Sequence, residues 1–161
     1  MKLKVLVTDD VELYRQNTVS ILSNNENVDC ILEAQDGREE LNKIMEEKPD
    51  IVITDMKMPE MTGLEVIKEI KKSNLEKKPQ FILVTSDRSS DLMSQIRELG
   101  EILVYKPLDS KTLNQYIDEY YLANQITKEE QKCTEISLEK IEEKEKFWKK
   151  ILKFFGSIIK K

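Results

Sequence analysis

The sequence contains no histidine among its 161 residues. Ser-His-Asp hydrolases, Cys-His proteases, histidine-ligated zinc sites and phosphohistidine carriers all need an imidazole, so this chain can build none of them. Acid–base or metal chemistry must therefore use carboxylates, lysines, hydroxyls or the two cysteines.

Cysteine and long apolar runs are also scarce. Cys30 and Cys133 lie far apart without C-x-x-C spacing, which favours two reduced thiols in a reducing compartment. The N-terminus shows no signal core of roughly 7–15 apolar residues with a cleavage site after it. No apolar run approaches the roughly 18 residues of a membrane-spanning helix. We expect a cytoplasmic protein that is at most peripheral to a membrane.

Charge is plentiful but unevenly distributed. The formal net charge of −5 divides into −8 for residues 1–127, −3 for residues 128–145 and +6 for residues 146–161. An acidic body argues against direct DNA binding, because phosphate neutralisation needs a basic face.

Short apolar runs alternate with stretches of helical spacing. The runs are rich in Val, Ile and Leu, as in strands buried on both faces, and they cover residues 3–7, 28–32, 51–53, 81–84 and 102–105. Each is followed by apolar residues at intervals of three and four. Five strand–helix repeats predict an α/β fold with a doubly wound, five-stranded parallel sheet.

Polar residues follow the predicted strands at the edge where an open parallel sheet binds its ligands. Asp9 and Asp10 follow the first strand, and Asp55, Thr85 and Lys106 end or follow later ones. Three crowded carboxylates repel one another unless a cation joins them, and oxygen ligands suit Mg²⁺. A carboxylate beside Mg²⁺, a lysine and a hydroxyl could accept a phosphoryl group. The alternative for each single residue is a helix cap or turn.

The chain resembles the CheY-like receiver domain of bacterial two-component response regulators over about residues 1–122. The resemblance rests on four segments: V-L-V-T-D-D at 5–10, P-D-I-V-I-T-D-M-K-M-P-E-M-T-G-L-E at 49–65, F-I-L-V-T-S at 81–86, and V-Y-K-P at 104–107. It implies the flavodoxin-like strand order 2-1-3-4-5.

The resemblance also implies a metal site. Asp55 and Asp10 would bind Mg²⁺ (Mn²⁺ is the second choice), and Asp9 would act mainly through water. The backbone carbonyl of Lys57 would be a further ligand.

The same resemblance assigns the phosphoryl chemistry. Asp55 would be the phosphoacceptor, Thr85 the switch hydroxyl that turns toward the phosphoryl group, and Lys106 its ion-pair partner. Pro107 matches a position that usually follows a cis peptide bond.

Two features concern how such a site would be tuned. Many receivers carry Tyr or Phe where this chain has Leu103, whereas its aromatic residue is Tyr105, expected on the same side of the strand. Lys57 and Asp87 could pair across the mouth of the site, or both could simply be solvated.

We expect two parts: a receiver domain over residues 1–124 and an amphipathic helical tail over residues 125–161, with no DNA-binding output domain. Thr127 and Glu130 form a capping box that predicts a helix start. Beyond it, apolar residues at helical spacing are bordered by the basic tip. Three occupants of this tail's apolar face stay open: an anionic membrane, a partner protein or second copy, and the receiver itself.

The function that follows is signalling rather than enzymatic turnover. A histidine kinase or histidine phosphotransfer protein would phosphorylate Asp55, the aspartyl phosphate would hydrolyse slowly, and a downstream protein would bind the altered surface. The alternative is a receiver-fold scaffold that is never phosphorylated and acts through its tail. A haloacid-dehalogenase-like phosphatase is disfavoured, because Asp55 is followed by Met56 and Lys57 rather than by D-x-D spacing.

Overall fold

The computed structural model describes residues 2–129 and residue 146. The chain divides into two compact units, Met1–Tyr121 and Leu122–Lys161. The predicted boundary between residues 124 and 125 stays a prediction, and most of the predicted tail, including its basic apolar tip, lies outside the described residues. Among the described helices, none is long and apolar enough to cross a membrane.

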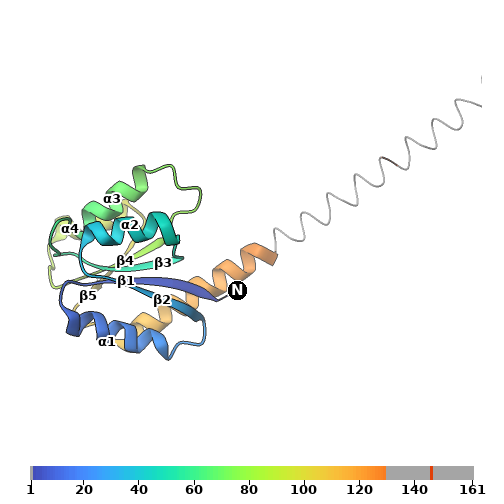
Figure 1. Ribbon diagram of the computed structural model, residues 1–161, viewed down its shortest axis with the longest axis horizontal. Coiled ribbons are helices and arrows are strands. Elements are labelled where there is room, and N and C mark those ends of the chain that lie inside the picture. The colour runs from blue at the N-terminus through green and yellow to red at the C-terminus, as the bar shows by residue number, and fades with distance from the viewer. Residues whose placement is uncertain (1, 130–145, 147–161) are drawn as a thin grey trace, which may run out of the picture. The chain divides into compact units, whose positions relative to one another are not determined.

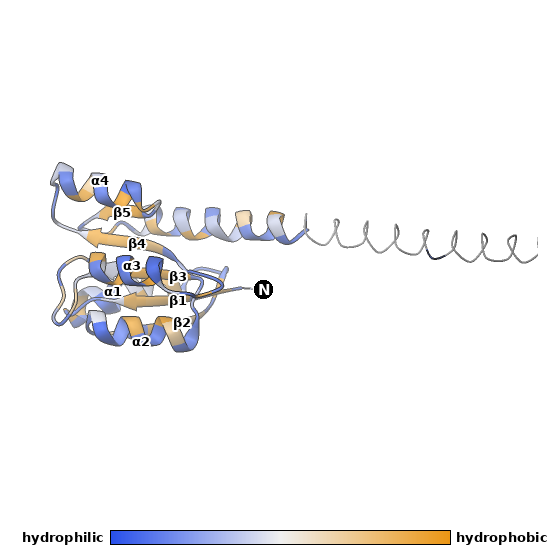
Figure 2. Ribbon diagram, turned by 90° about the horizontal axis from the view of Figure 1, so that it is seen from above, coloured by the Kyte–Doolittle hydropathy of each residue, from blue (hydrophilic) through white to orange (hydrophobic). Residues whose placement is uncertain are grey.

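The first unit is built on a parallel sheet, as predicted. Its strands, labelled in Figure 1, are hydrogen-bonded in the order β2-β1-β3-β4-β5, and Figure 2 shows them in this order across the sheet. They are β1 (Leu3–Thr8), β2 (Val28–Ala34), β3 (Ile51–Asp55), β4 (Gln80–Thr85) and β5 (Ile102–Tyr105). The helices that follow them are α1 (Glu12–Ser23), α2 (Gly37–Glu47), α3 (Gly63–Lys72), α4 (Ser90–Glu98) and a helix over residues 110–129.

Two apolar layers enclose the sheet, because successive strand residues point to opposite faces. On one face Leu6, Val52 and Phe81 pack with residues of α2, α3 and α4. On the other, Val5 and Ile53 pack with residues of α1 and of the 110–129 helix. Figure 2 shows the result: the strands are largely apolar, whereas the helices mix apolar and polar residues. Loops at the strand ends are left free to carry the site.

Local sequence signals fix the helix ends near the site. Asp36 caps α2 by accepting the N–H groups of Arg38 and Glu39. Thr62 and Glu65 form a capping box at the start of α3. The local sequence therefore fixes where α3 begins, and with it the length of the turn that follows β3.

Two expectations were wrong in detail. The strands β2 and β5 lie at the edges of the sheet, so most of their residues are only half-buried, unlike those of β1, β3 and β4. Thr127 lies inside the 110–129 helix and donates its hydroxyl hydrogen to the carbonyl of Ala123 at 3.0 Å. It therefore starts no new helix, because the preceding turns leave no helix terminus there to cap.

Candidate functional site

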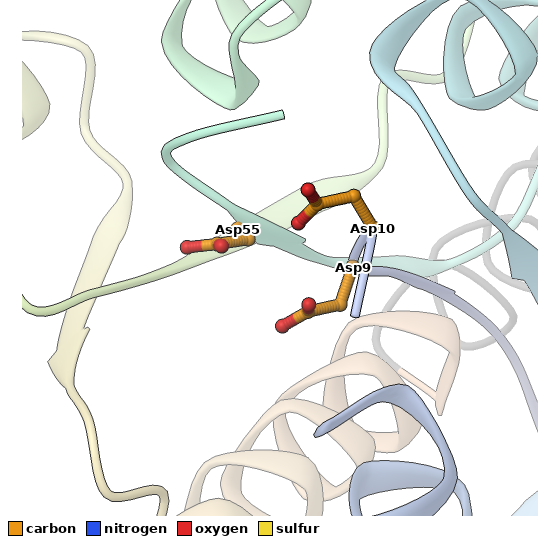
Figure 3. A group of neighbouring side chains, drawn as sticks. All are labelled: Asp9, Asp10 and Asp55. Carbon is orange, nitrogen blue, oxygen red and sulfur yellow. The ribbon is translucent and has the colours of Figure 1, made fainter. Parts of the chain in front are cut away.

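Three carboxylates lie at one edge of the sheet. Parallel pairing sets Thr8 of β1 beside Thr54 of β3, which brings the following residues Asp9 and Asp55 together. Oxygen atoms of Asp9, Asp10 and Asp55 all lie within 4.8 Å of one another (Figure 3). The convergence expected from the strand ends is therefore present in the structure.

Lys106 partly neutralises this cluster. Its ammonium lies 3.0 Å from a carboxylate oxygen of Asp9 and 3.0 Å from one of Asp55, and 4.6 Å from the ring centre of Tyr14. The Lys106–Pro107 peptide bond is cis, as the resemblance implied. Burial alone would lower the pKa of Lys106, but the hydrogen bonds and charges of the two aspartates raise it above the ordinary value. Lys106 is a firmly protonated cation.

Asp55 is a largely buried carboxylate that also lines a pocket open to solvent. Burial raises the pKa of its carboxyl above the ordinary value, the charge of Asp9 acts in the same direction, and Lys106 opposes both. Its side chain is 12% exposed. A carboxylate held in this way is positioned as a nucleophile or a metal ligand.

The donor set fits a hard divalent cation. Three carboxylates carry more negative charge than Lys106 can balance, and oxygen ligands are those that Mg²⁺ prefers. The backbone carbonyl of Lys57 accepts no hydrogen bond from any of the described residues. Asp9, Asp10, Asp55 and this carbonyl could therefore hold a metal ion.

A second group of polar residues surrounds Asp55 on its other side. Thr85, at the end of β4, is 1% exposed and accepts the N–H of Asp87 at 3.0 Å. Asp55, Thr85 and Lys106 line a pocket of about 440 Å³ together with Lys57, Ser86, Asp87 and Arg88. A pocket of this composition suits a small anion next to Asp55.

The suggested pairing of Lys57 with Asp87 does not occur as an ion pair in the described part of the chain. Asp87 instead accepts the N–H of Ser89 at 2.8 Å. Hydrogen bonds from Ser89 lower the pKa of Asp87, and the charge of Lys57 adds to that effect. Asp87 thus serves mainly to shape the loop after β4.

A family model described as the response regulator receiver domain matches residues 5–118. The chain belongs to this family. Receiver domains of known structure share its fold. The signal receiver domain of the putative response regulator NarL from Mycobacterium tuberculosis is 25% identical, with a TM-score of 0.68 over 74% of this chain and 96% of that one. The chemotaxis protein CheY4 of Vibrio cholerae is 27% identical, with a TM-score of 0.66 over 74% and 99%.

Curated relatives are longer proteins. The transcriptional regulatory protein YdfI of Bacillus subtilis is 34% identical over 116 residues, which are 71% of this chain and 53% of YdfI. A protein-glutamate methylesterase/protein-glutamine glutaminase of Clostridium acetobutylicum is 37% identical over 75 residues, which are 47% of this chain and 22% of that protein. The chain thus spans about half or less of the length of these relatives.

Sequence reasoning missed Arg15, which contacts the backbone of the acidic loop, Asp9 and Asp10, that follows β1. Arg15 is 7% exposed, donates to the backbone carbonyl of Asp9 at 2.8 Å, and pairs with Glu33 of β2 at 3.0 Å. It fixes the backbone from which Asp9 and Asp10 extend. An arginine among the apolar positions of α1 was the available signal.

Sequence reasoning also missed Glu40, a fully buried carboxyl beneath the receiver's acidic site. Thr54 donates to one of its oxygens at 2.8 Å, while the other oxygen and the hydroxyl of Thr8 have no hydrogen-bond partner. Burial raises the pKa of Glu40 to about 8, although the hydrogen bond from Thr54 lowers it. Glu40 is therefore a neutral acid at neutral pH, and its proton could satisfy the hydroxyl of Thr8. The signal was a glutamate one helical turn before the buried Ile44.

Proposed function

We propose that this receiver domain accepts a phosphoryl group on Asp55 in a Mg²⁺-dependent reaction. The observation that supports this best is the position of Asp55 between the acidic cluster and Lys106. Its carboxylate lies within 4.8 Å of two further carboxylates and 3.0 Å from the Lys106 ammonium. Asp9, Asp10, Asp55 and the carbonyl of Lys57 are the proposed metal ligands. Mg²⁺, when bound there, supplies positive charge that balances the oxygens of the transferring phosphoryl group.

The transfer needs only one new bond in the protein. A carboxylate oxygen of Asp55 attacks phosphorus and forms an acyl phosphate, while the phosphorus bond to the donor breaks. In a phosphohistidine donor this is a P–N bond, and the imidazole nitrogen leaves with its electron pair and takes up a proton. Lys106 holds the carboxylate and then pairs with a phosphoryl oxygen, and the hydroxyl of Thr85 donates to another. Water later cleaves the acyl phosphate slowly.

The proposed setting is a two-component phosphorelay. A histidine kinase or histidine phosphotransfer protein donates the phosphoryl group, because this chain has no histidine of its own. The receiver is a signalling protein and not a turnover enzyme, and it acts in the cytoplasm by protein contact. Residues 125–161 are proposed to form an amphipathic tail that contacts an anionic membrane, a partner protein or a second copy.

The deciding experiment is phosphorylation of the whole chain with acetyl phosphate or phosphoramidate and Mg²⁺. Intact mass spectrometry should show one added phosphoryl group on the wild type and none on Asp55→Asn. Asp91→Asn, a carboxylate substitution on α4, is the matched control and should label normally. Equal labelling of wild type and Asp55→Asn would refute the assignment. A wild type that takes up no phosphoryl group would instead favour the unphosphorylated scaffold.

The tail needs a separate test on the same protein. Co-sedimentation of the whole chain with anionic vesicles at low salt should be compared with a variant in which Lys149, Lys150 and Lys153 become glutamate. Binding that the charge reversal removes supports a membrane contact. If the wild type does not bind the vesicles, the membrane contact is refuted, and a partner protein, a second copy or the receiver itself is left to cover the tail's apolar face.

A further inference from the structure

Arg88 has an unusual position at the rim of the site. It lies in the loop between β4 and α4, three residues after Thr85, and its side chain is exposed. Its guanidinium carbon lies 4.7 Å from the ring centre of Tyr105, a distance typical of a cation–π contact. No carboxylate of the described residues pairs with it.

Tyr105 lies opposite Thr85 in the pairing of β4 with β5. The ring also borders a second pocket of about 430 Å³ between α4 and β5, which Leu103, Met93 and Ile96 line as well. Leu103 and Tyr105 thus face the same side of β5, as alternation predicts. Tyr105, which lies two residues after the position at which many receivers carry an aromatic residue, therefore lines the α4–β5 pocket.

The Arg88–Tyr105 contact consequently joins two pockets. Arg88 lines the 440 Å³ pocket around Asp55, whereas Tyr105 lines the 430 Å³ pocket on the α4–β5 face. A change in the position of Arg88 alters the support of the Tyr105 ring. The pair is thus a physical connection between the acceptor carboxylate and a surface that a partner can contact.

The charges around Asp55 explain why Arg88 would move. Lys106 is already paired with both Asp9 and Asp55. A phosphoryl group on Asp55 replaces a carboxylate of charge −1 with an acyl phosphate of charge about −2 and supplies three acceptor oxygens. Arg88 offers a planar fork of donors that suits phosphoryl oxygens, and a charge-assisted hydrogen bond is stronger than an exposed cation–π contact.

We propose that Arg88 is a phosphoryl-sensing residue, which leaves Tyr105 and binds an oxygen of the phosphoryl group on Asp55. The ring of Tyr105 is then free to change its position in the α4–β5 pocket. In this chain the Arg88–Tyr105 pair takes the place of a switch aromatic at position 103. The inference rests on the proposed phosphorylation of Asp55 and adds the residue that transmits it.

The first test measures binding of beryllofluoride, a phosphoryl analogue, to the whole chain in the presence of Mg²⁺. Arg88→Ala should weaken the apparent affinity about tenfold, in keeping with the loss of one charge-assisted hydrogen bond. Arg88→Lys keeps the charge but loses the planar fork of donors, so its apparent affinity should lie between those of the wild type and Arg88→Ala. Arg38→Ala, an exposed arginine on α2, is the matched control and should bind like the wild type.

The second test follows Tyr105 directly. Fluorotyrosine labelling gives one ¹⁹F signal for each of the five tyrosines, and Tyr105→Phe identifies the signal of interest. In the wild type this signal should move when beryllofluoride binds. In Arg88→Ala it should already be displaced without the analogue and should move less than half as far when saturated.

The outcomes separate the two proposals. Unchanged affinity in Arg88→Ala, or a Tyr105 signal that moves as far as in the wild type, overturns the sensing role while leaving phosphorylation of Asp55 intact. Beryllofluoride binding by Asp55→Asn as tight as that of the wild type overturns the proposed function itself. Both variants replace exposed or site residues outside the core, so circular dichroism can confirm their folding.

Discussion

Glu40 shows how much one buried side chain can set the pH response of the receiver. Its pKa of about 8 in the folded protein compares with 4.5 for an ordinary glutamate. Between these values the folded state keeps a proton that the unfolded state has released. The free energy of unfolding therefore falls as the pH rises through this range, by up to about 1.4 kcal/mol per pH unit, and levels off above it.

We predict that Glu40→Gln removes this dependence. Urea unfolding should show the variant gaining stability relative to the wild type from pH 5 to pH 8, because its amide carries no proton to lose. Glu39→Gln is the control: the hydrogen bond from Lys43 lowers the pKa of Glu39, so its effect belongs below pH 4.5 and should be constant between pH 5 and 8. A constant difference for Glu40→Gln would show that Glu40 is ionised when folded.

Arg15 is the second residue whose removal should be costly. We predict that Arg15→Met lowers the free energy of unfolding by about 2–4 kcal/mol, because it strands the buried carbonyl of Asp9 and leaves Glu33 without its cation. Phosphorylation from acetyl phosphate should slow as well, since the acidic loop loses its support. Arg97→Met, at an exposed position on α4, should change neither quantity; equal behaviour of the two variants would contradict the prediction.

At the scale of elements, strand positions and the meeting of polar residues were predictable because both follow from short sequence patterns. Apolar runs gave the strands, and the parallel sheet then required that residues after β1 and β3 meet. Long-range contacts were not predictable in this way. Arg15 pairs with Glu33, and Glu40 lies under Thr54, only because α1 and α2 pack against particular strands. Periodicity assigns a helix face but not the polar partner across it.

The turn between β3 and α3 depends on Gly63. A Cβ atom at this position would lie 2.4 Å from the carbonyl oxygen of Asp55 and 2.8 Å from the hydroxyl of Thr54. We predict that Gly63→Ala lowers the free energy of unfolding by about 1–3 kcal/mol and slows phosphorylation, because the backbone of Asp55 must move.

Gly100 provides the matched control for this prediction. It ends the turn after α4 with φ of +72°, and a Cβ atom there would meet nothing within 4 Å. Gly100→Ala should therefore cost roughly 1 kcal/mol of stability through backbone strain alone and leave the rate of phosphorylation unchanged. If Gly63→Ala also left the rate unchanged, the turn would not be what positions Asp55.

At the scale of the whole molecule, repulsion within the acidic cluster lowers the free energy of unfolding, and a bound cation removes that repulsion. The receiver places three carboxylates within 4.8 Å of one another and supplies Lys106 as their cation among the described residues. Repulsion between Asp55 and the Asp9–Asp10 pair destabilises the folded state only, because the unfolded chain separates Asp55 from that pair. A ligand that binds the folded state alone then stabilises the domain by mass action.

We therefore predict that Mg²⁺ raises the midpoint of thermal unfolding and that chelation reverses the effect. At a tenfold excess over its dissociation constant, the ion should add about 1.4 kcal/mol to the free energy of unfolding. Asp10→Asn should abolish most of this response and, by removing one repelling charge, should make the metal-free protein slightly more stable. Asp29→Asn, at an exposed position on β2, should respond to Mg²⁺ like the wild type. An equal Mg²⁺ response in both variants would mean that the ion stabilises the acidic body generally rather than at the strand ends.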